Sequence, residues 1–188
     1  MKALCVYCGS NPGFRNVYAE AAEALGCALA ERGIGLVYGG AAMGLMGRIA
    51  DAVLDAGGEV QGVIPHALMQ KEIAHTGVTR LHVVDTMHER KALMAKLSDG
   101  FVAMPGGFGT LEEIIEIVTW AQLRFHGKPC GLFNVDGYFN HLVAYLEHAE
   151  REGFLKPEHR RMLTVADDPR ALIEAYERYT APATEKWL

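Results

Sequence analysis

Seven short apolar segments alternate along the chain with longer segments in which apolar residues recur every three or four positions. The short segments cover residues 3–8, 34–38, 60–64, 80–84, 100–104, 130–135 and 162–166. Their nearly continuous apolar character is typical of strands that are buried on both faces. The pattern therefore predicts buried strands that are separated by helical connections.

The longer segments have the spacing of amphipathic helices. Helical patterns occur at residues 22–29, 45–53, 87–97, 110–125 and 138–152. Glycines at positions 33, 57–58 and 127 fall where three of these helices should end. Buried strands that alternate with amphipathic helices predict an α/β domain with a mostly parallel sheet and helices on both faces.

Composition adds a few constraints to this picture. The chain has 188 residues, half of them hydrophobic, which suits one domain over residues 1–180, and we expect residues 181–188 to form a frayed tail. A net charge of −5 gives no basic face for nucleic acid and no polybasic patch for a membrane. No apolar run reaches the ~20 residues of a membrane span. Four cysteines and no signal-peptide pattern indicate a cytoplasmic protein.

The most informative stretch follows the apolar segment 100–104. It reads Pro105-Gly106-Gly107-Phe108-Gly109-Thr110-Leu111-Glu112-Glu113. A strand, a glycine turn and a helix that opens at Thr110 together present backbone N–H groups and the positive end of a helix dipole. Glycines let a phosphate approach the main chain without a Cβ in the way. The stretch therefore predicts an anion cradle with two carboxylates beside it.

Two other glycine turns follow predicted strands, at residues 9–13 and 39–44. In an open parallel sheet, ligands bind at the carboxyl ends of the strands, so we expect the three turns to meet at one edge. The turns lack the G-x-G-x-x-G pattern of dinucleotide-binding domains, and the chain lacks the Gly-Lys-Ser/Thr of a P-loop. A monophosphate on a small ligand fits this pattern better than a dinucleotide or a nucleoside triphosphate.

The 105–113 stretch resembles the P-G-G-x-G-T-x-x-E signature of the "Lonely guy" family. These proteins are cytokinin riboside 5′-monophosphate phosphoribohydrolases, and many bacterial members were long called lysine decarboxylases. Further stretches agree with the family in order and spacing: Tyr38-Gly39-Gly40 with Met43-Gly44-Leu45-Met46-Gly47, Gly62-Val63-Ile64-Pro65, Met87-His88-Glu89-Arg90-Lys91, Thr119-Trp120-Ala121-Gln122-Leu123, and Asn134-Val135-Asp136-Gly137-Tyr138. The resemblance implies a single-domain, modified Rossmann-like fold.

The resemblance also implies one reaction, in which a nucleoside 5′-monophosphate, AMP included, is hydrolysed to a free base and ribose 5-phosphate. It assigns catalysis to residues matching Arg90 and Glu113. The candidate substrate contacts around them are Ser10, Gly39, Gly40, Glu72, Met87, Lys91, Gly106, Gly107, Phe108, Gly109, Thr110, Leu111, Glu112 and Thr119. We expect no metal site and no cofactor.

The chemistry can also be argued from the residues. Cleavage of an N-glycosidic bond builds positive charge on the ribose, and a carboxylate beside the sugar stabilises that cation and can orient the attacking water. Glu113, expected in the first turn of its helix, lies about one turn from the phosphate cradle, which suits the span from a 5′-phosphate to C1′. Glu116, one turn further on, could help to hold that face. Arg90 has a permanently charged planar fork that can bind phosphate or organise the acid. The sequence does not name the group that protonates the leaving base.

The charged candidates have a purely structural alternative. Glu112 and Glu113 could simply complement the dipole of their helix. Arg90 and Lys91 could form the solvated face of an amphipathic helix. The full signature around these residues favours the functional interpretation.

The remaining candidates also have simpler explanations. Thr119 could bond to the backbone of its own helix, Glu72 could be an ordinary loop acid, and Ser10 could cap the next helix. Cys5-x-x-Cys8 suggests redox or zinc chemistry, but it has no second pair and lies in a strand segment. We therefore expect both cysteines to be small buried residues.

Two classes of function remain open. One is the hydrolase, and the other is a non-catalytic binding protein of related fold, such as a molybdenum-cofactor carrier, which could keep the glycine turns without Arg90 and Glu113. The presence of both residues favours the enzyme. An amino-acid decarboxylase is a poor third candidate, because the chain is small and shows no evident context for a cofactor-binding lysine.

The family resemblance further implies a homodimer with the site near its interface. The segment 110–125 supports this, because its apolar residues cover more than the single stripe of a surface helix. They include Ile114, Ile115, Ile117 and Val118. One side of this helix could therefore face the sheet and another side a second subunit. The alternative is that one monomer buries the whole apolar arc under its own C-terminal helix.

Overall fold

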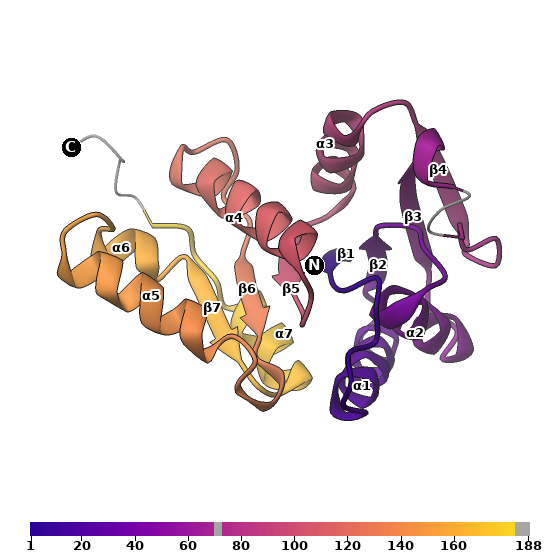
Figure 1. Ribbon diagram of the computed structural model, residues 1–188, viewed down its shortest axis with the longest axis horizontal. Helices are drawn as coiled ribbons and strands as arrows, with labels where there is room; N and C mark the ends of the chain where they lie inside the picture. The colour runs from indigo at the N-terminus through magenta and orange to yellow at the C-terminus, as the bar shows by residue number, and fades with distance from the viewer. Residues whose placement is uncertain (70–72, 183–188) are drawn as a thin grey trace.

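A seven-stranded parallel sheet runs through the protein (Figure 1). The computed structural model describes residues 1–69 and 73–182. The strands are β1 (Ala3–Tyr7), β2 (Gly35–Tyr38), β3 (Val60–Pro65), β4 (Arg80–Val84), β5 (Gly100–Ala103), β6 (Cys130–Phe133) and β7 (Leu163–Ala166). They confirm the seven predicted strands, and every neighbouring pair is parallel. The prediction that every strand is buried is wrong at the edges of the sheet, where β4 has no buried residue and β7 is mostly only partly buried.

Helices and short 3-10 turns connect the strands. They are α1 (Val17–Glu31), α2 (Gly44–Asp55), η1 (His66–Leu68), α3 (Met87–Leu97), α4 (Phe108–Gln122), η2 (Val135–Gly137), α5 (Asn140–Arg151), α6 (Pro157–Arg160) and α7 (Pro169–Glu177). The five predicted helices are present. No residue range was predicted for the C-terminal helix α7, although its start is marked in the sequence: Pro169 is its first residue, and the Asp168 side chain caps it by accepting from the Ala171 N–H at 2.8 Å.

The two faces of the sheet have separate apolar cores, because successive side chains of a strand point to opposite faces. Leu4 and Val6 of β1 pack on the core beneath α1, α2 and α7, whereas Ala3, Cys5 and Tyr7 pack on the core beneath α3, α4 and α5. Figure 1 shows these two layers of helices on either side of the sheet. The prediction of helices on both faces is confirmed.

The strand order places a switch point at the centre of the sheet. The order is β4-β3-β2-β1-β5-β6-β7. The chain therefore builds outward from β1 through β2, β3 and β4, and then returns to add β5 on the other side of β1. Loops that leave adjacent strands in opposite directions open a crevice at their carboxyl ends, and this is where such folds bind ligands.

Two further observations complete the description of the fold. No helix among the described residues combines the length and the apolar character needed to span a membrane. Residues 183–188 of the predicted frayed tail lie outside the described residues, so this expectation stays a prediction.

Candidate active site

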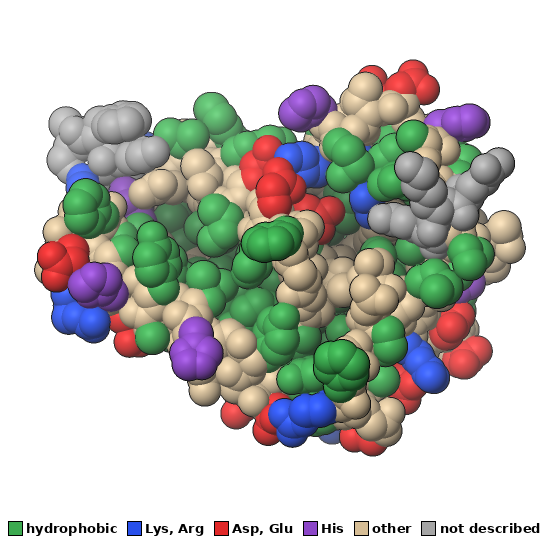
Figure 2. Space-filling view, viewed as in Figure 1, with side chains coloured by type: hydrophobic (Ala, Val, Ile, Leu, Met, Phe, Trp, Pro, Cys, Tyr) green, Lys and Arg blue, Asp and Glu red, His purple; other side chains and the backbone are tan. Residues whose placement is uncertain are grey.

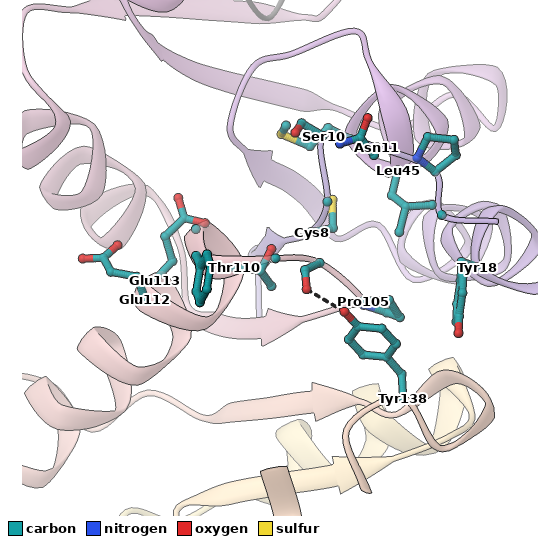
Figure 3. Close-up of a pocket in the computed structure, with 18 of the residues that line it drawn as sticks. Cys8, Ser10, Asn11, Tyr18, Leu45, Pro105, Thr110, Glu112, Glu113 and Tyr138 are labelled. Atoms are coloured by element: carbon teal, nitrogen blue, oxygen red, sulfur yellow. Dashed lines mark hydrogen bonds between the residues drawn. The ribbon is translucent and has the colours of Figure 1, made fainter. Parts of the chain in front are cut away.

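A cavity of about 510 Å³ opens at the switch point, beyond the carboxyl ends of β1 and β5 (Figure 3). Its wall combines the loop after β1, the start of α2, part of α3, the turn between β5 and α4, and Tyr138. This volume suits a small-molecule ligand. Segments far apart in the sequence therefore meet here, as the sheet topology requires.

Backbone contacts tie the three glycine turns together. The Gly9 N–H donates to the Pro105 carbonyl at 3.0 Å, and the Gly9 carbonyl accepts from the Leu45 N–H at 3.1 Å. Gly44 has a positive φ of 60°, and a Cβ there would lie 2.3 Å from the carbonyl carbon of Ser10. The prediction that the turns meet at one edge is confirmed, and part of their glycine content serves this close approach.

Helix α4 points its N-terminus at the cavity. It begins at Phe108 with Gly107 as the N-cap, so the predicted start at Thr110 is wrong. Thr110 is instead buried under the turn, where a Cβ on Gly106 would lie 2.1 Å from its Oγ1. Among the described residues no side chain caps this helix. Its first-turn N–H groups and its dipole therefore favour an anion in the cavity.

Gly107 and Gly109 border open space. A Cβ added to either would have no described atom within 4 Å. Gly107 has a φ of −95°, which any residue can adopt, so the backbone does not demand glycine there. Both line the cavity, where the lack of a Cβ leaves room for a ligand to reach the main chain.

The two carboxylates of the signature follow in the second turn of α4. The first turn contains no acidic residue, so the predicted first-turn position of Glu113 is wrong. The effect of the helix dipole falls off within the first turn, which weakens the purely electrostatic explanation for these acids. Glu113 is half-buried and Glu112 is exposed, and both line the cavity. In Figure 3 they lie on the opposite side of Thr110 from Tyr18.

Arg90 reaches the cavity from α3. Only 6% of its surface is exposed, so the alternative of a solvated helix face is wrong for this residue. Its Nη2 donates to the Gly39 carbonyl at 3.0 Å, and its Nη1 lies 3.8 Å from the Met87 sulfur. Its Nε is buried without a hydrogen-bond partner among the described residues. A buried cation with an unused donor is costly unless a ligand or water satisfies it.

Lys91 binds the neighbouring helix rather than the cavity. Its Nζ pairs with Glu112 at 2.5 Å and with Glu116 at 2.9 Å, both on α4. Burial opposes the shift, but these two carboxylates raise the pKa of Lys91 above its ordinary value. Figure 2 shows acidic side chains gathered beside basic ones where α3 meets α4. Lys91 therefore links the helices that carry Arg90 and Glu113.

The charged candidates affect the pKa values of two buried thiols, Cys5 within β1 and Cys8 just after it. Burial raises the pKa of the Cys5 thiol well above its ordinary value, with Glu113 adding to the shift and Arg90 opposing it. Burial also raises the pKa of Cys8, again with a contribution from Glu113. Both cysteines are buried and unpaired, as predicted. Thiols held in the neutral form are poor nucleophiles and metal ligands.

Some predicted contacts lie away from the cavity wall. Gly39 and Gly40 do not line the cavity. The Gly39 carbonyl accepts from Arg90, and Gly40 has a φ of 80° with Ile64 and Leu81 packed against it. Leu111 packs on the core under α4. Glu72 lies outside the described residues, so its role stays a prediction.

Thr119 belongs to a different surface. Its hydroxyl donates to the Ile115 carbonyl of its own helix at 2.7 Å. It also lines a second, smaller cavity of about 160 Å³ between α4 and the segment 146–163. Within one chain Thr119 therefore does not line the cavity that holds Glu113.

The structure adds lining residues that the sequence analysis did not single out. Asn11, Tyr18, Leu68 and Tyr138 all line the cavity. Tyr138 follows an Asp-Gly pair within one of the family-like stretches. Such a pair is typical of a tight turn, so the sequence indicated the turn that presents Tyr138. The other three lie in loops or on faces whose neighbours only the tertiary fold brings together.

Comparison with known proteins gives consistent matches over most of the chain. The family model described as "Possible lysine decarboxylase" matches residues 46–176. The probable cytokinin riboside 5′-monophosphate phosphoribohydrolase LOGL9 of Oryza sativa subsp. japonica is 49% identical over 178 residues, which is 95% of this chain and 78% of that protein. The cytokinin riboside 5′-monophosphate phosphoribohydrolase LOG3 of Arabidopsis thaliana is 47% identical over 185 residues, 98% of this chain and 86% of that protein.

Solved structures of similar shape include two molybdenum-cofactor proteins. The carrier protein of Chlamydomonas reinhardtii has a TM-score of 0.71 at 21% identity, covering 94% of this chain and 96% of that one. The binding protein of the phototrophic bacterium Rippkaea orientalis has a TM-score of 0.70 at 22% identity, with the same coverage. At this identity the likeness concerns the fold alone, and it confirms the Rossmann-like architecture.

Proposed function

Since this chain belongs to the "Lonely guy" family of cytokinin riboside 5′-monophosphate phosphoribohydrolases, we propose that it hydrolyses the N-glycosidic bond of nucleoside 5′-monophosphates, AMP included. The products are a free base and ribose 5-phosphate. One observation carries the proposal. A single cavity joins the uncapped N-terminus of α4 to the half-buried Glu113 and the buried Arg90.

The 5′-phosphate binds at the start of α4. There the first-turn N–H groups and the helix dipole favour a dianion, and Gly107 and Gly109 leave room for its oxygens. Thr110 lies beneath the turn and fixes its shape. This anchor holds the sugar in place while the bond at C1′ breaks, so remote binding energy supports the chemical step.

Glu113 acts at the reacting carbon, which is C1′ of the ribose. As the bond from C1′ to the base nitrogen breaks, the electron pair leaves with the base and positive charge develops on the ribose. The Glu113 carboxylate stabilises this charge and takes a proton from the water that attacks C1′. The bond from water oxygen to C1′ completes ribose 5-phosphate, and the base leaves with a proton from a second donor.

Arg90 organises the same region. Its Nη2 donates to the Gly39 carbonyl, its Nη1 lies 3.8 Å from the Met87 sulfur, and the residue lines the cavity. A permanent cation that lines the same cavity as Glu113 can bind the anionic substrate and offset the charge of that carboxylate. Both roles predict a catalytic loss when the charge is removed.

An end-point assay tests the reaction. Purified protein without added metal or cofactor should release free adenine from AMP, detected by chromatography. Adenosine should be a far poorer substrate in kcat/KM, because it lacks the group that the α4 N-terminus binds. Intact AMP after long incubation at high enzyme concentration would overturn the proposal. Equal kcat/KM for AMP and adenosine would remove the phosphate cradle from it.

The protein also acts as a homodimer within this proposal, with the site near the interface. The support is an apolar surface between α4 and α5, where Ile115 is exposed and Val118, Leu146 and Leu155 line the second cavity (Figure 2). Thr119, a predicted substrate contact, lies on this surface. A two-fold axis would bury such a surface against its own copy.

Light scattering at micromolar concentration tests the assembly. We expect about twice the 20.5 kDa of one chain for the native protein. Ile115→Glu should shift the mass toward the monomer. Val83→Glu is the matched control, because Val83 is an exposed residue of β4 at the far edge of the sheet. A single-chain mass for the native protein would refute the dimer.

The cytoplasm is the proposed location. Cys5, Cys8 and Cys130 are buried, unpaired thiols, and burial raises the pKa of each. Cys27 is an exposed free thiol. Such usage suits a reducing compartment. Fractionation with an antibody to the native chain would test it.

A further inference from the structure

We propose that Tyr138 is a positioning residue. It holds the Gly106 carbonyl toward its own hydroxyl, and it thereby directs the Gly107 N–H into the phosphate cradle. The inference rests on the proposed function and extends it to a residue outside the glycine signature. Tyr138 comes from the segment after η2, more than thirty residues beyond the turn that it touches. In Figure 3 its side chain lies just below that turn.

Two hydrogen bonds hold the turn between β5 and α4 from different elements. The Gly9 N–H donates to the Pro105 carbonyl at 3.0 Å, and the Tyr138 hydroxyl donates to the Gly106 carbonyl at 2.7 Å. In a trans peptide the carbonyl and the following N–H point in opposite directions. A Gly106 carbonyl that is held toward Tyr138 therefore turns the Gly107 N–H away from Tyr138.

Gly107 lines the cavity and adjoins open space. A Cβ on Gly107 would meet no described atom within 4 Å, and Gly107 is the N-cap of α4. The orientation of the Gly106–Gly107 peptide is thus not fixed by packing around Gly107. Glycine allows a peptide to rotate more freely than other residues do. Thr110 packs against the turn at Gly106, and the hydroxyl of Tyr138 adds a second restraint on the peptide that joins Gly106 to Gly107.

The loop that carries Tyr138 is built to present it. Asp136 and Gly137 both have a positive φ, of 49° and 72°, which reverses the chain tightly after β6. The Asn134 side chain closes the turn by accepting from the Phe139 N–H at 2.7 Å. A left-handed Asp is tolerated because of its short polar side chain, and a left-handed Gly costs little.

The ring of Tyr138 is held by other aromatic rings. It makes edge-on contacts with Tyr18, at 5.7 Å between centroids, and with Phe139, at 5.0 Å. The side chain is nevertheless 41% exposed, so these contacts rather than burial set its position. Phenylalanine at this position keeps the ring contacts and removes only the hydroxyl. The substitution therefore isolates the hydrogen bond to Gly106.

Calorimetric binding of ribose 5-phosphate tests the inference on the full-length protein. Tyr138→Phe should raise the Kd about three- to tenfold, the range for one lost hydrogen bond. The KM for AMP should rise by a similar factor with a smaller change in kcat, and adenosine kcat/KM should not change. Tyr145→Phe is the matched control, because Tyr145 is an exposed tyrosine of α5 away from the cavity. Thermal unfolding shows that both variants fold.

The outcomes separate this inference from the proposed function. If the native protein releases adenine and Tyr138→Phe binds ribose 5-phosphate as tightly as the native protein, the role of Tyr138 is refuted and the reaction stands. If the native protein binds ribose 5-phosphate but releases no base, the reaction is refuted, and the Kd comparison still decides on Tyr138. Equal losses for AMP and adenosine would indicate a general structural role and overturn the inference. If the native protein releases adenine without measurable binding of ribose 5-phosphate, the reaction stands and the KM for AMP decides on Tyr138.

Discussion

Arg90 occupies the space that a side chain at position 39 would need. A Cβ built on Gly39 would lie 2.1 Å from the Arg90 Nη2, and the same Nη2 donates to the Gly39 carbonyl at 3.0 Å. Gly39 thus positions the guanidinium in two ways: it leaves room for it, and its carbonyl accepts a hydrogen bond from it. This contact fixes a cation of α3 against the end of β2.

We therefore expect Gly39→Ala to act through Arg90. The methyl group must displace the guanidinium, and kcat/KM for AMP should fall on the order of tenfold to 10²-fold. Gly35→Ala is the control in the same strand, because its Cβ would meet only an ordinary contact of 3.5 Å. In an Arg90→Ala background, Gly39→Ala should have little further effect on kcat/KM. Additive losses in the double variant would contradict the prediction.

Removing the charge of Glu113 should separate chemistry from folding. Glu113→Gln keeps the shape of the side chain and should lower kcat on the order of 10²-fold or more, as for lost electrostatic stabilisation of a transition state. The melting temperature should change little. Glu147→Gln, at an exposed site of α5, is the matched control and should leave kcat unchanged. Near-normal turnover in Glu113→Gln would show that this carboxylate is structural.

The stability of the fold should fall in mild acid because of His126. The Lys128 N–H can only donate, so the His126 Nδ1 accepts from it at 3.1 Å, and its Nε2 carries the proton toward the Ile117 carbonyl at 2.9 Å. Burial lowers the pKa of His126, with Lys128 adding to the shift. A depressed pKa means that the unfolded chain binds more protons below pH ~6.5, so stability is complete above that pH and declines below it.

Urea unfolding between pH 7.5 and 5.5 measures this decline. His126→Gln should flatten the dependence of the unfolding free energy on pH. Part of the slope should remain, because burial also lowers the pKa of His82. His141→Gln, at an exposed position of α5, should leave the slope as in the native protein. An unchanged slope in His126→Gln would assign the effect to other groups.

The sequence predicted the sheet well because buried parallel strands are apolar on both faces. Segments such as 100–104 have no competing helical pattern, and all seven strands formed as predicted. Helix starts were predicted less accurately. The glycine-rich stretch 105–109 is typical of a loop, whereas Phe108 and Gly109 are helical in the structure. The glycines there have low helix propensity, and the tertiary contacts of the turn override it.

The candidate site was predictable where one local stretch carries it. The cradle was predicted from the 105–113 signature, and the structure places this stretch in one cavity with Ser10, Met87 and Arg90 across the switch point. The roles of supporting residues were not predictable, because they depend on partners that are distant in sequence. Arg90 donates to the Gly39 carbonyl and Tyr138 donates to the Gly106 carbonyl, and no local pattern in the sequence identifies the partner in either contact.

Lys91 and Glu116 should behave as a coupled pair that sets the spacing of α3 and α4. Lys91 is only 12% exposed at its side chain and lies between Glu112 and Glu116, so its pairing is worth more than that of a fully solvated lysine. Its neighbour along α3 is Arg90, and the acid between its two partners on α4 is Glu113. A change in this link should alter how the two catalytic candidates face each other.

A double-mutant cycle measures the link at pH 7–8. There Lys91 is fully charged, because its raised pKa means that the stabilisation is complete below pH ~10.4 and is lost only as the pH rises through the folded value. Lys91→Met and Glu116→Gln should each lower kcat for AMP several-fold. The double variant should have a kcat little lower than that of either single variant, which corresponds to a coupling free energy of about 0.5–1 kcal/mol or more. The exposed pair Arg48–Glu23 between α2 and α1 is the control, with expected coupling near zero. A different pattern would contradict the link: if Lys91 instead binds the substrate directly, Lys91→Met raises the KM for AMP strongly while Glu116→Gln leaves it unchanged.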